Sequence, residues 1–209
     1  MSGAKMTSEE IRESFNQLAP DYDRRLWFDT HVLGVARLRR ELMSQASGRI
    51  LDVACGTGSN FAHFPAGCEV VGMDLSEGML KMAQATTDAL GRRVDLRLMN
   101  VEKLSFPEHS FDSVVSAIST CTFPNPVQAL KEMKRVCRPE GKILLLEHGR
   151  SAVGLLAAHQ DKTAEAHYHA HAGCRWNQDP LKLAKAAGLQ LNRVTRAKLG
   201  VFYLIQARP

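Results

Sequence analysis

The chain has 209 residues, of which 44% are hydrophobic and 23% charged, as expected for one globular domain, or one domain with a small appendage. Its 27 basic and 22 acidic residues give a net charge of +5, a mild bias toward anionic partners such as nucleic acid or an acidic membrane face. Five cysteines without CxxC pairing argue against a disulfide framework and indicate reduced thiols in a cytosol. The start MSGAKMTSEE lacks a signal-peptide core and no apolar run approaches the ~18 residues of a membrane span. We therefore expect a cytoplasmic protein that at most lies on a membrane surface.

The first part of the chain, residues 1–47, has the pattern of two helices. Residues 7–19 begin with a capping box and carry an apolar face formed by Ile11, Phe15 and Leu18. A second helical pattern covers residues 29–46. Between them lie basic and apolar residues suited to a membrane interface, namely Arg24, Arg25, Leu26, Trp27 and Phe28. We expect this segment to be a lid over a binding site, a peripheral contact with an anionic membrane, or both.

From residue 48 onward, short apolar runs alternate with helical patterns. The expected strands are 49–53, 69–74, 94–99, 111–118 and 141–147, and the expected helices lie near 58–64, 76–90 and 125–137. This alternation predicts βαβ units and a parallel sheet. A helix at 179–187 and two final strands joined by a short loop predict an antiparallel pair at one sheet edge. The segment 149–178 is expected as a joint.

The first strand is followed by the glycine turn of LDVACGTGSN, residues 51–60. In a doubly wound sheet, ligands bind at this edge, outside the carboxyl ends of the strands. The turn lacks the third glycine of a dinucleotide fingerprint, because Phe61 occupies that position, and it lacks the lysine of a Walker loop. Glycine amides and a helix N-terminus suit a carboxylate instead, and Asp52 suits an ammonium group.

Two later turns extend this pattern. Asp74 ends the second strand, 22 residues after Asp52, where a carboxylate can accept both ribose hydroxyls. Asn100 and Val101 follow the third strand, where an adenine edge could be read, and an adenine slot would be lined by Met73, Leu75 and Met79. Carboxylate, ammonium, ribose and adenine together describe S-adenosylmethionine.

The motifs LDVACGTG, GMDLSEGML, MNVEKLSFPEHSFDSVVS and LKEMKRVCRPEGKILLLEHGRS resemble the successive motifs of class I S-adenosylmethionine-dependent methyltransferases. Ala54 replaces the usual first glycine, and Asn100 replaces the usual aspartate. The resemblance implies an α/β, Rossmann-like doubly wound seven-stranded sheet over residues 48–209, mostly parallel with an antiparallel edge strand. It also implies S-adenosylmethionine as methyl donor and S-adenosylhomocysteine as product. The expected cofactor-binding residues are Asp52, Ala54, Gly56, Gly58, Asn60, Asp74, Leu75, Met79, Asn100, Val101, Glu102 and Ser116.

Two subgroups compete for the methyl acceptor. IRESFNQLAPDYDRR resembles ubiquinone/menaquinone C-methyltransferases, whereas LLLEHGRS, STCTFPNPVQAL and GCRWNQDP are closer to bacterial phosphatidylethanolamine N-methyltransferases. We favour the second group, which implies methylation of the ethanolamine headgroup. A quinone, or a small-molecule amine or thiol, stays open. STCTFPNP lacks the Asn/Asp-Pro-Pro-aromatic turn of base-methylating enzymes, so no nucleic-acid partner is expected.

The acceptor chemistry suggests further candidates. A primary amine must lose its proton before methyl transfer, and His148, directly after the fifth strand, is the expected base. Tyr22 is expected to close over the methyl donor. Tyr168 and Trp176 could form an aromatic wall for a methylated ammonium. Contacts to a phosphate are expected from His167, His171 and Arg175.

The stretch HYHAHAGC also raises the question of a metal. His167 and His171 are one helical turn apart and Cys174 is nearby, but no paired cysteine completes a zinc set. We therefore expect no metal, and we expect the chain to act as a monomer.

Overall fold

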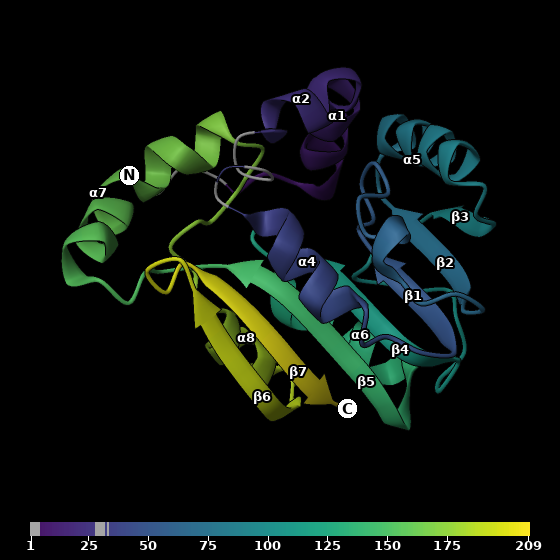
Figure 1. Ribbon diagram of the computed structural model, residues 1–209. Coiled ribbons are helices and arrows are strands. Elements are labelled where there is room, and N and C mark those ends of the chain that lie inside the picture. Colours follow the sequence, from purple (N-terminus) through teal and green to yellow (C-terminus); the bar gives the residue numbers. More distant parts are fainter. Residues whose placement is uncertain (1–4, 28–31, 33) are drawn as a thin grey trace.

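The computed structural model describes residues 5–27, 32 and 34–209. A seven-stranded sheet in the order β3-β2-β1-β4-β5-β7-β6 forms its centre (Figure 1). The strands are β1 (Arg49–Val53), β2 (Glu69–Asp74), β3 (Val94–Leu98), β4 (Phe111–Ala117), β5 (Cys137–His148), β6 (Gln190–Ala197) and β7 (Phe202–Arg208). β1 to β5 are parallel, which confirms the doubly wound fold.

The final two strands form the antiparallel pair expected at the sheet edge. β7 lies between β5 and β6 and runs antiparallel to both, so β6 is the outermost strand. β6 consequently points in the same direction as β1 to β5. Its carboxyl end, and the turn that follows, therefore lie at the same edge of the sheet as the glycine turn.

Helices cover both faces of the sheet, as its uninterrupted apolar strands predict. Figure 1 shows α4 (Val35–Met43) on one face and α6 (Pro126–Val136) with α8 (Pro180–Ala186) on the other. Successive strand residues enter opposite cores: Leu51 packs with α6 and α8, and Ile50 packs with α4. α5 (Glu77–Leu90) begins at Ser76, whose hydroxyl accepts from the Met79 amide at 3.0 Å, and ends at a left-handed Gly91.

The N-terminal segment starts with α1 (Ser8–Leu18), and its expected capping box is present. The Thr7 hydroxyl accepts from the Glu10 amide at 3.2 Å, while the Glu10 carboxylate accepts from the Thr7 amide at 2.7 Å. A 3-10 turn, η1 (Ala19–Asp21), and the short α2 (Tyr22–Arg25) follow. α4 begins after Gly34, whose φ of 73° is incompatible with a right-handed helix. The earlier part of the helix expected at 29–46 falls mainly on residues 28–31 and 33, outside the described residues.

Two segments differ from the sequence-based expectation. The helix expected near 58–64 is only the 3-10 turn η2 (Phe61–His63), because Gly58 has a φ of 85° and cannot belong to a helix. The Phe61 ring packs where a Gly58 side chain would start. The joint expected at 149–178 instead contains α7 (Gly154–Ala170), a 17-residue helix without a single apolar face, which is why its periodicity gave no signal.

Within the part of the chain that the structure describes, no helix combines the length and the apolar character needed to cross a membrane.

Candidate active site

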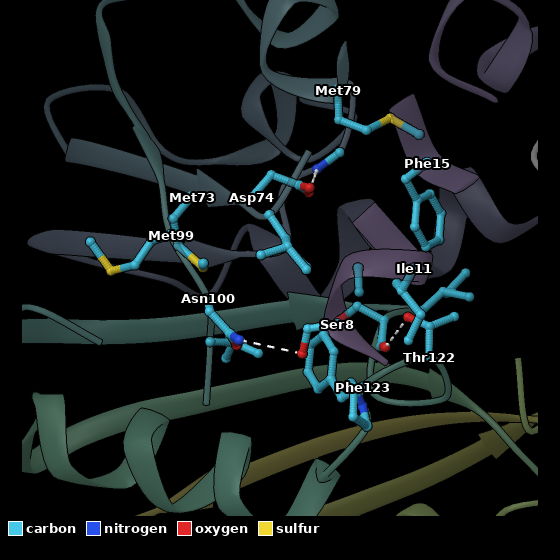
Figure 2. Close-up of a pocket in the computed structure, with 18 of the residues that line it drawn as sticks. Ser8, Ile11, Phe15, Met73, Asp74, Met79, Met99, Asn100, Thr122 and Phe123 are labelled. Atoms are coloured by element: carbon cyan, nitrogen blue, oxygen red, sulfur yellow. Dashed lines mark hydrogen bonds between the residues drawn. The ribbon is translucent and has the colours of Figure 1, made fainter. Parts of the chain in front are cut away.

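A pocket opens at the carboxyl ends of β1, β2, β3 and β4, beneath α1. It encloses about 690 Å³ of space, its open mouth included. It is lined by Ser8, Ile11, Phe15, Tyr22, Ala54, Gly56, Met73, Asp74, Leu75, Met79, Met99, Asn100, Val101, Ala117, Ile118, Ser119, Thr122, Phe123 and Pro124. Figure 2 shows most of these residues, with the labelled side chains converging from α1, the strand ends and the loop after β4. A pocket of this size and apolar character suits a small organic ligand.

Asp74 lies at the centre of the expected cofactor site. Its carboxylate accepts from the amides of Gly56 and Ser76, each at 2.9 Å, and the residue is 8% exposed. Burial raises the pKa of this carboxyl, and the amide hydrogen bonds oppose the shift. These bonds hold the carboxylate at the pocket wall with lone pairs left for two ribose hydroxyls.

Asp52 lies behind the glycine turn rather than in the pocket lining. Its Oδ1 accepts from the Asn60 amide nitrogen at 2.7 Å, whereas its buried Oδ2 has no hydrogen-bond partner among the described residues. Burial raises the pKa of Asp52 to about 7, against the Asn60 hydrogen bond and the charge of Arg39. Asn60 is itself held by Arg39 at 2.5 Å. The Asp52 Oδ2 lies outside the pocket lining, so the ammonium contact that the sequence assigns to Asp52 stays a prediction.

The turn between β1 and η2 has the conformation that its glycines allow. Gly56 and Gly58 have φ of 56° and 85°, and Ala54, in place of the usual glycine, also has a positive φ of 51°. A Cβ at Gly56 would meet no atom within 4 Å, because this position borders the pocket. Ala54 and Gly56 therefore line the pocket as expected, and Gly58 serves the turn.

The expected adenine side is formed by Leu75, Met79, Asn100 and Val101, all in the pocket lining. The Asn100 side-chain oxygen accepts from the Glu102 amide at 2.9 Å, and its nitrogen lies 3.5 Å from the Ser8 hydroxyl (Figure 2). Glu102 points away from the pocket, because its carboxylate accepts from the amide of Asn125 at 2.7 Å, before α6. It is therefore not a cofactor ligand in this arrangement.

α1 covers the pocket as a lid. Ser8, Ile11 and Phe15 face into it from this helix. The Asn16 side-chain oxygen accepts from the Ser76 hydroxyl at 2.7 Å and from the Gly78 amide at 3.0 Å, which fixes α1 to the start of α5.

Tyr22, expected to close over the methyl donor, lines the same pocket and is half-buried. Burial raises the pKa of its hydroxyl, so the phenol is neutral at physiological pH. Its ring meets the Phe15 ring edge-on, with the centroids 6.2 Å apart.

The other acceptor candidates from the sequence do not line the pocket. Tyr168 accepts a hydrogen bond from the Met6 amide at 2.8 Å, and so holds the start of α1. The Arg175 guanidinium donates to the Phe123 carbonyl, and the Trp176 ring donates to the Gln160 carbonyl of α7 at 3.2 Å. These three side chains are used in tertiary contacts outside the pocket lining, so the aromatic wall and the phosphate contact of Arg175 stay predictions.

The three candidate histidines, His148, His167 and His171, also lie outside the pocket lining. His167 stacks between His171 and Trp176, with ring centroids 4.0 Å and 4.4 Å away, outside the pocket lining. His148 lies 3.4 Å from the Cys174 sulfur through its Nε2. Burial lowers the pKa of His148, but this contact and the nearby negative charges outweigh burial and raise it overall. His148 therefore does not face the pocket as a base.

A buried polar chain leads from the pocket into the sheet, and of its members the sequence predicts only Ser116 as a site residue. Ser119 lines the pocket and hydrogen-bonds Ser116, whose hydroxyl donates to Glu147 at 3.2 Å. Ser116 is thus behind the lining rather than in contact with a cofactor. Glu147 is fully buried, and burial raises its pKa to about 7. Its only sequence signal is a carboxylate at the end of an apolar strand.

A family model described as a methyltransferase domain matches residues 51–145. The S-adenosylmethionine-dependent methyltransferase of Thermotoga maritima has the same fold, with a TM-score of 0.70 at 21% identity over 95% of this chain and 99% of that chain. The family match supports S-adenosylmethionine as the cofactor expected from the sequence, and the Asp74 carboxylate at the pocket wall fits it.

Three similar curated proteins are named for different activities, so they do not agree on one methyl acceptor. The phosphatidylethanolamine N-methyltransferase of Cereibacter sphaeroides is 34% identical over 53% of this chain and 56% of its own length. The demethylmenaquinone methyltransferase of Renibacterium salmoninarum is 34% identical over 70% of this chain and 62% of its own length. The yeast mitochondrial methyltransferase OMS1 is 27% identical over 97% of this chain and 47% of its own length. The chain thus spans about half to three fifths of the relatives it matches.

Proposed function

On the premise that residues 51–145 belong to the methyltransferase-domain family and that S-adenosylmethionine is the cofactor, we propose that the chain N-methylates phosphatidylethanolamine at a membrane surface. The resemblance of LLLEHGRS and GCRWNQDP to phosphatidylethanolamine N-methyltransferases led to this substrate. The similarity to the Cereibacter sphaeroides enzyme supports it.

The observation that carries the proposal is the chemistry of the pocket wall. Three aromatic rings line it, from Phe15, Tyr22 and Phe123, and the lining, which lies within the described part of the chain, includes no Lys, Arg or His. Aromatic faces attract ammonium groups, and a wall without cationic side chains does not repel them. Such a wall suits a sulfonium donor and an amine that becomes a permanent cation as methyl groups are added.

The residues of the chain account for the steps that such a transfer needs. S-adenosylmethionine, when bound, would supply an electrophilic methyl group to the amine, whose nitrogen must first lose a proton. Ser119 lies at the pocket wall and can pass that proton through Ser116 to Glu147. α1 excludes water above the site, and Asp74 fixes the cofactor, so most of the rate comes from positioning.

An exposed apolar rim supports a lipid substrate. Val153, Leu155 and Leu199 are 42%, 85% and 66% exposed, and the Ala152 amide donates to the Leu199 carbonyl at 3.1 Å, which joins the two segments. Both segments follow strands that end at the pocket edge of the sheet, β5 and β6. Apolar side chains on a chain of net charge +5 suit an anionic bilayer, and they bring the pocket edge toward the lipid headgroups.

The demethylmenaquinone methyltransferase match covers more of this chain, so a quinone is the second candidate. A labelled-methyl assay would present the purified chain with vesicles of phosphatidylethanolamine and phosphatidylglycerol, and in parallel with vesicles of phosphatidylglycerol that contain a demethylquinone. We expect label in the ethanolamine lipid. Label only in the quinone would replace the proposed substrate with the second candidate.

The rim is tested in the same vesicles. The double variant Leu155→Ser/Leu199→Ser should sediment less with them and methylate them more slowly, with unchanged S-adenosylmethionine affinity. Leu90→Ser is the matched control, because Leu90 is 43% exposed at the far end of α5. Equal sedimentation of the double variant and the control would argue against membrane docking through the rim.

A further inference from the structure

Two cysteines and a histidine from distant parts of the chain meet behind the pocket. Cys121 lies in the loop after β4, His148 is the last residue of β5, and Cys174 follows α7. One donor atom from each residue lies within 4.8 Å of the other two. Three side chains that can each bind a metal ion thus converge on one point, although 53 positions separate the two cysteines.

The backbone holds this cluster in place. The Arg175 amide donates to the Cys121 carbonyl at 3.0 Å, which ties the Cys174 segment to the loop after β4. The Cys174 amide donates to the His171 carbonyl at 2.9 Å. Cys121 and Cys174 are 2% and 8% exposed, so their sulfur atoms are shielded from solvent.

A fourth donor is close at hand. The His167 ring, whose faces are stacked on His171 and Trp176, interacts with the Cys174 sulfur. It is not one of the three residues whose donor atoms lie within 4.8 Å of one another, so it is the nearest further imidazole rather than a member of the cluster as it stands. Two sulfur and two imidazole donors form the set that zinc takes in tetrahedral structural sites.

We propose that Cys121, His148 and Cys174 bind one zinc ion, with His167 as the fourth ligand. On binding, the two thiols release their protons to solvent and the histidines bind as neutral rings, so two thiolates balance the charge of the ion. The sequence alone predicts no metal, because it pairs Cys174 with neighbouring histidines only. The fold supplies the second cysteine from the loop after β4.

The proposed zinc site would stiffen the acceptor wall of the pocket. Cys121 directly precedes Thr122 and Phe123, which line the pocket, and His148 is next to Glu147. One ion would therefore join the loop after β4, the end of β5 and the segment after α7. This role does not depend on which acceptor the enzyme methylates.

Metal content of the full-length chain tests the proposal. We expect inductively coupled plasma mass spectrometry to find about one zinc ion per molecule of the purified chain. After removal of zinc with a chelator, cobalt should restore binding and give the charge-transfer absorption of a thiolate complex. Zinc added to the stripped chain should also raise its unfolding temperature.

Variants identify the ligands. Cys121→Ser and Cys174→Ser should each lower zinc affinity at least ~10-fold, the scale seen for ligand-shell changes. Cys68→Ser, at a half-buried cysteine before β2, should keep full zinc content. If a ligand variant does not fold, the titration of the stripped wild-type chain still decides.

Two results would overturn the proposal. The first is a folded, stripped wild-type chain that takes up neither zinc nor cobalt. The second is a freshly isolated chain lighter by two hydrogen atoms, with a peptide map that joins Cys121 to Cys174, because a disulfide would use the sulfur atoms that zinc needs.

Discussion

The cofactor end of the pocket and its acceptor end lie at one edge of the same sheet, but they are assembled differently. At the cofactor end, Asp74 is the last residue of β2 and Gly56 lies three residues after β1, and the Gly56 amide donates to the Asp74 carboxylate. At the acceptor end, Phe15, Phe123 and Ser119 come from α1 and from the loop after β4, far apart in sequence. A site formed by strand ends can be recognised from short sequence motifs. A site formed by distant segments cannot, because it depends on how the whole chain packs.

The largest expected effect lies at the cofactor end. Asp74→Ala removes the carboxylate that we expect to accept both ribose hydroxyls, and two hydrogen bonds to a charged group correspond to a loss of S-adenosylmethionine affinity of about 100-fold. Calorimetric titration measures it. Asp95→Ala, an exposed carboxylate on the neighbouring β3, is the control and should bind normally. An Asp74→Ala chain that is folded and binds as tightly as the wild type would remove Asp74 from the cofactor site.

The lid connects the two ends and should have the next largest effect. Asn16→Ala loses the hydrogen bonds to Ser76 and Gly78, which should cost about 10-fold in cofactor affinity. Hydrogen exchange in α1 should become faster in the variant. Gln17→Ala is a matched control, because the Gln17 amide donates to Glu13 within the same helix. If the two variants behave alike, Asn16 does not hold the lid closed.

A substitution at the acceptor end should change the KM for the amine substrate more than the affinity for the cofactor. Phe123→Leu keeps an apolar side chain but removes an aromatic face, so KM for the amine should rise about 5-fold, as expected for one cation–π contact. The affinity for S-adenosylmethionine should change less. Phe106→Leu, at a ring packed edge-on against Phe111, controls for loss of an aromatic elsewhere. An unchanged KM in Phe123→Leu would mean that the ring does not contact the acceptor.

The smallest effect concerns stability and pH. The pKa of Asp52 is about 7 in the folded chain. In the unfolded chain it is close to the ordinary ~3.9, so the folded chain retains a proton that the unfolded chain has lost. Stability therefore falls as pH rises from about 4 to about 7. Asp52→Asn keeps the hydrogen bond to Asn60 but has no titratable group at this position. Between about pH 5 and about pH 8, its unfolding temperature should therefore fall by a few degrees less than that of the wild-type chain. Parallel curves for the two chains would contradict a raised pKa at Asp52.

The sequence predicts the cofactor end of the pocket better than the acceptor end. The mostly parallel sheet with its antiparallel edge pair, the N-terminal helix, and the pocket positions of Asp74, Met79 and Asn100 are predictable, because each depends on local pattern or on a fixed place at the end of a strand. Tyr168 was not, because its role depends on Met6, 162 residues away. Glu147 was overlooked for a related reason: its hydrogen-bond partners on and after β4 become visible only when the strands are paired.

The two attachments of α1 constrain how ligands exchange. Tyr168 holds the backbone just before this helix, at Met6, and Asn16 holds its last turn against α5. Because α1 is held at both ends, it cannot move away from the pocket by rotation about one end alone. Release of the demethylated cofactor therefore requires either the Met6–Tyr168 contact or the Asn16–Ser76 contact to open, and a change that loosens α7 would open the first of them.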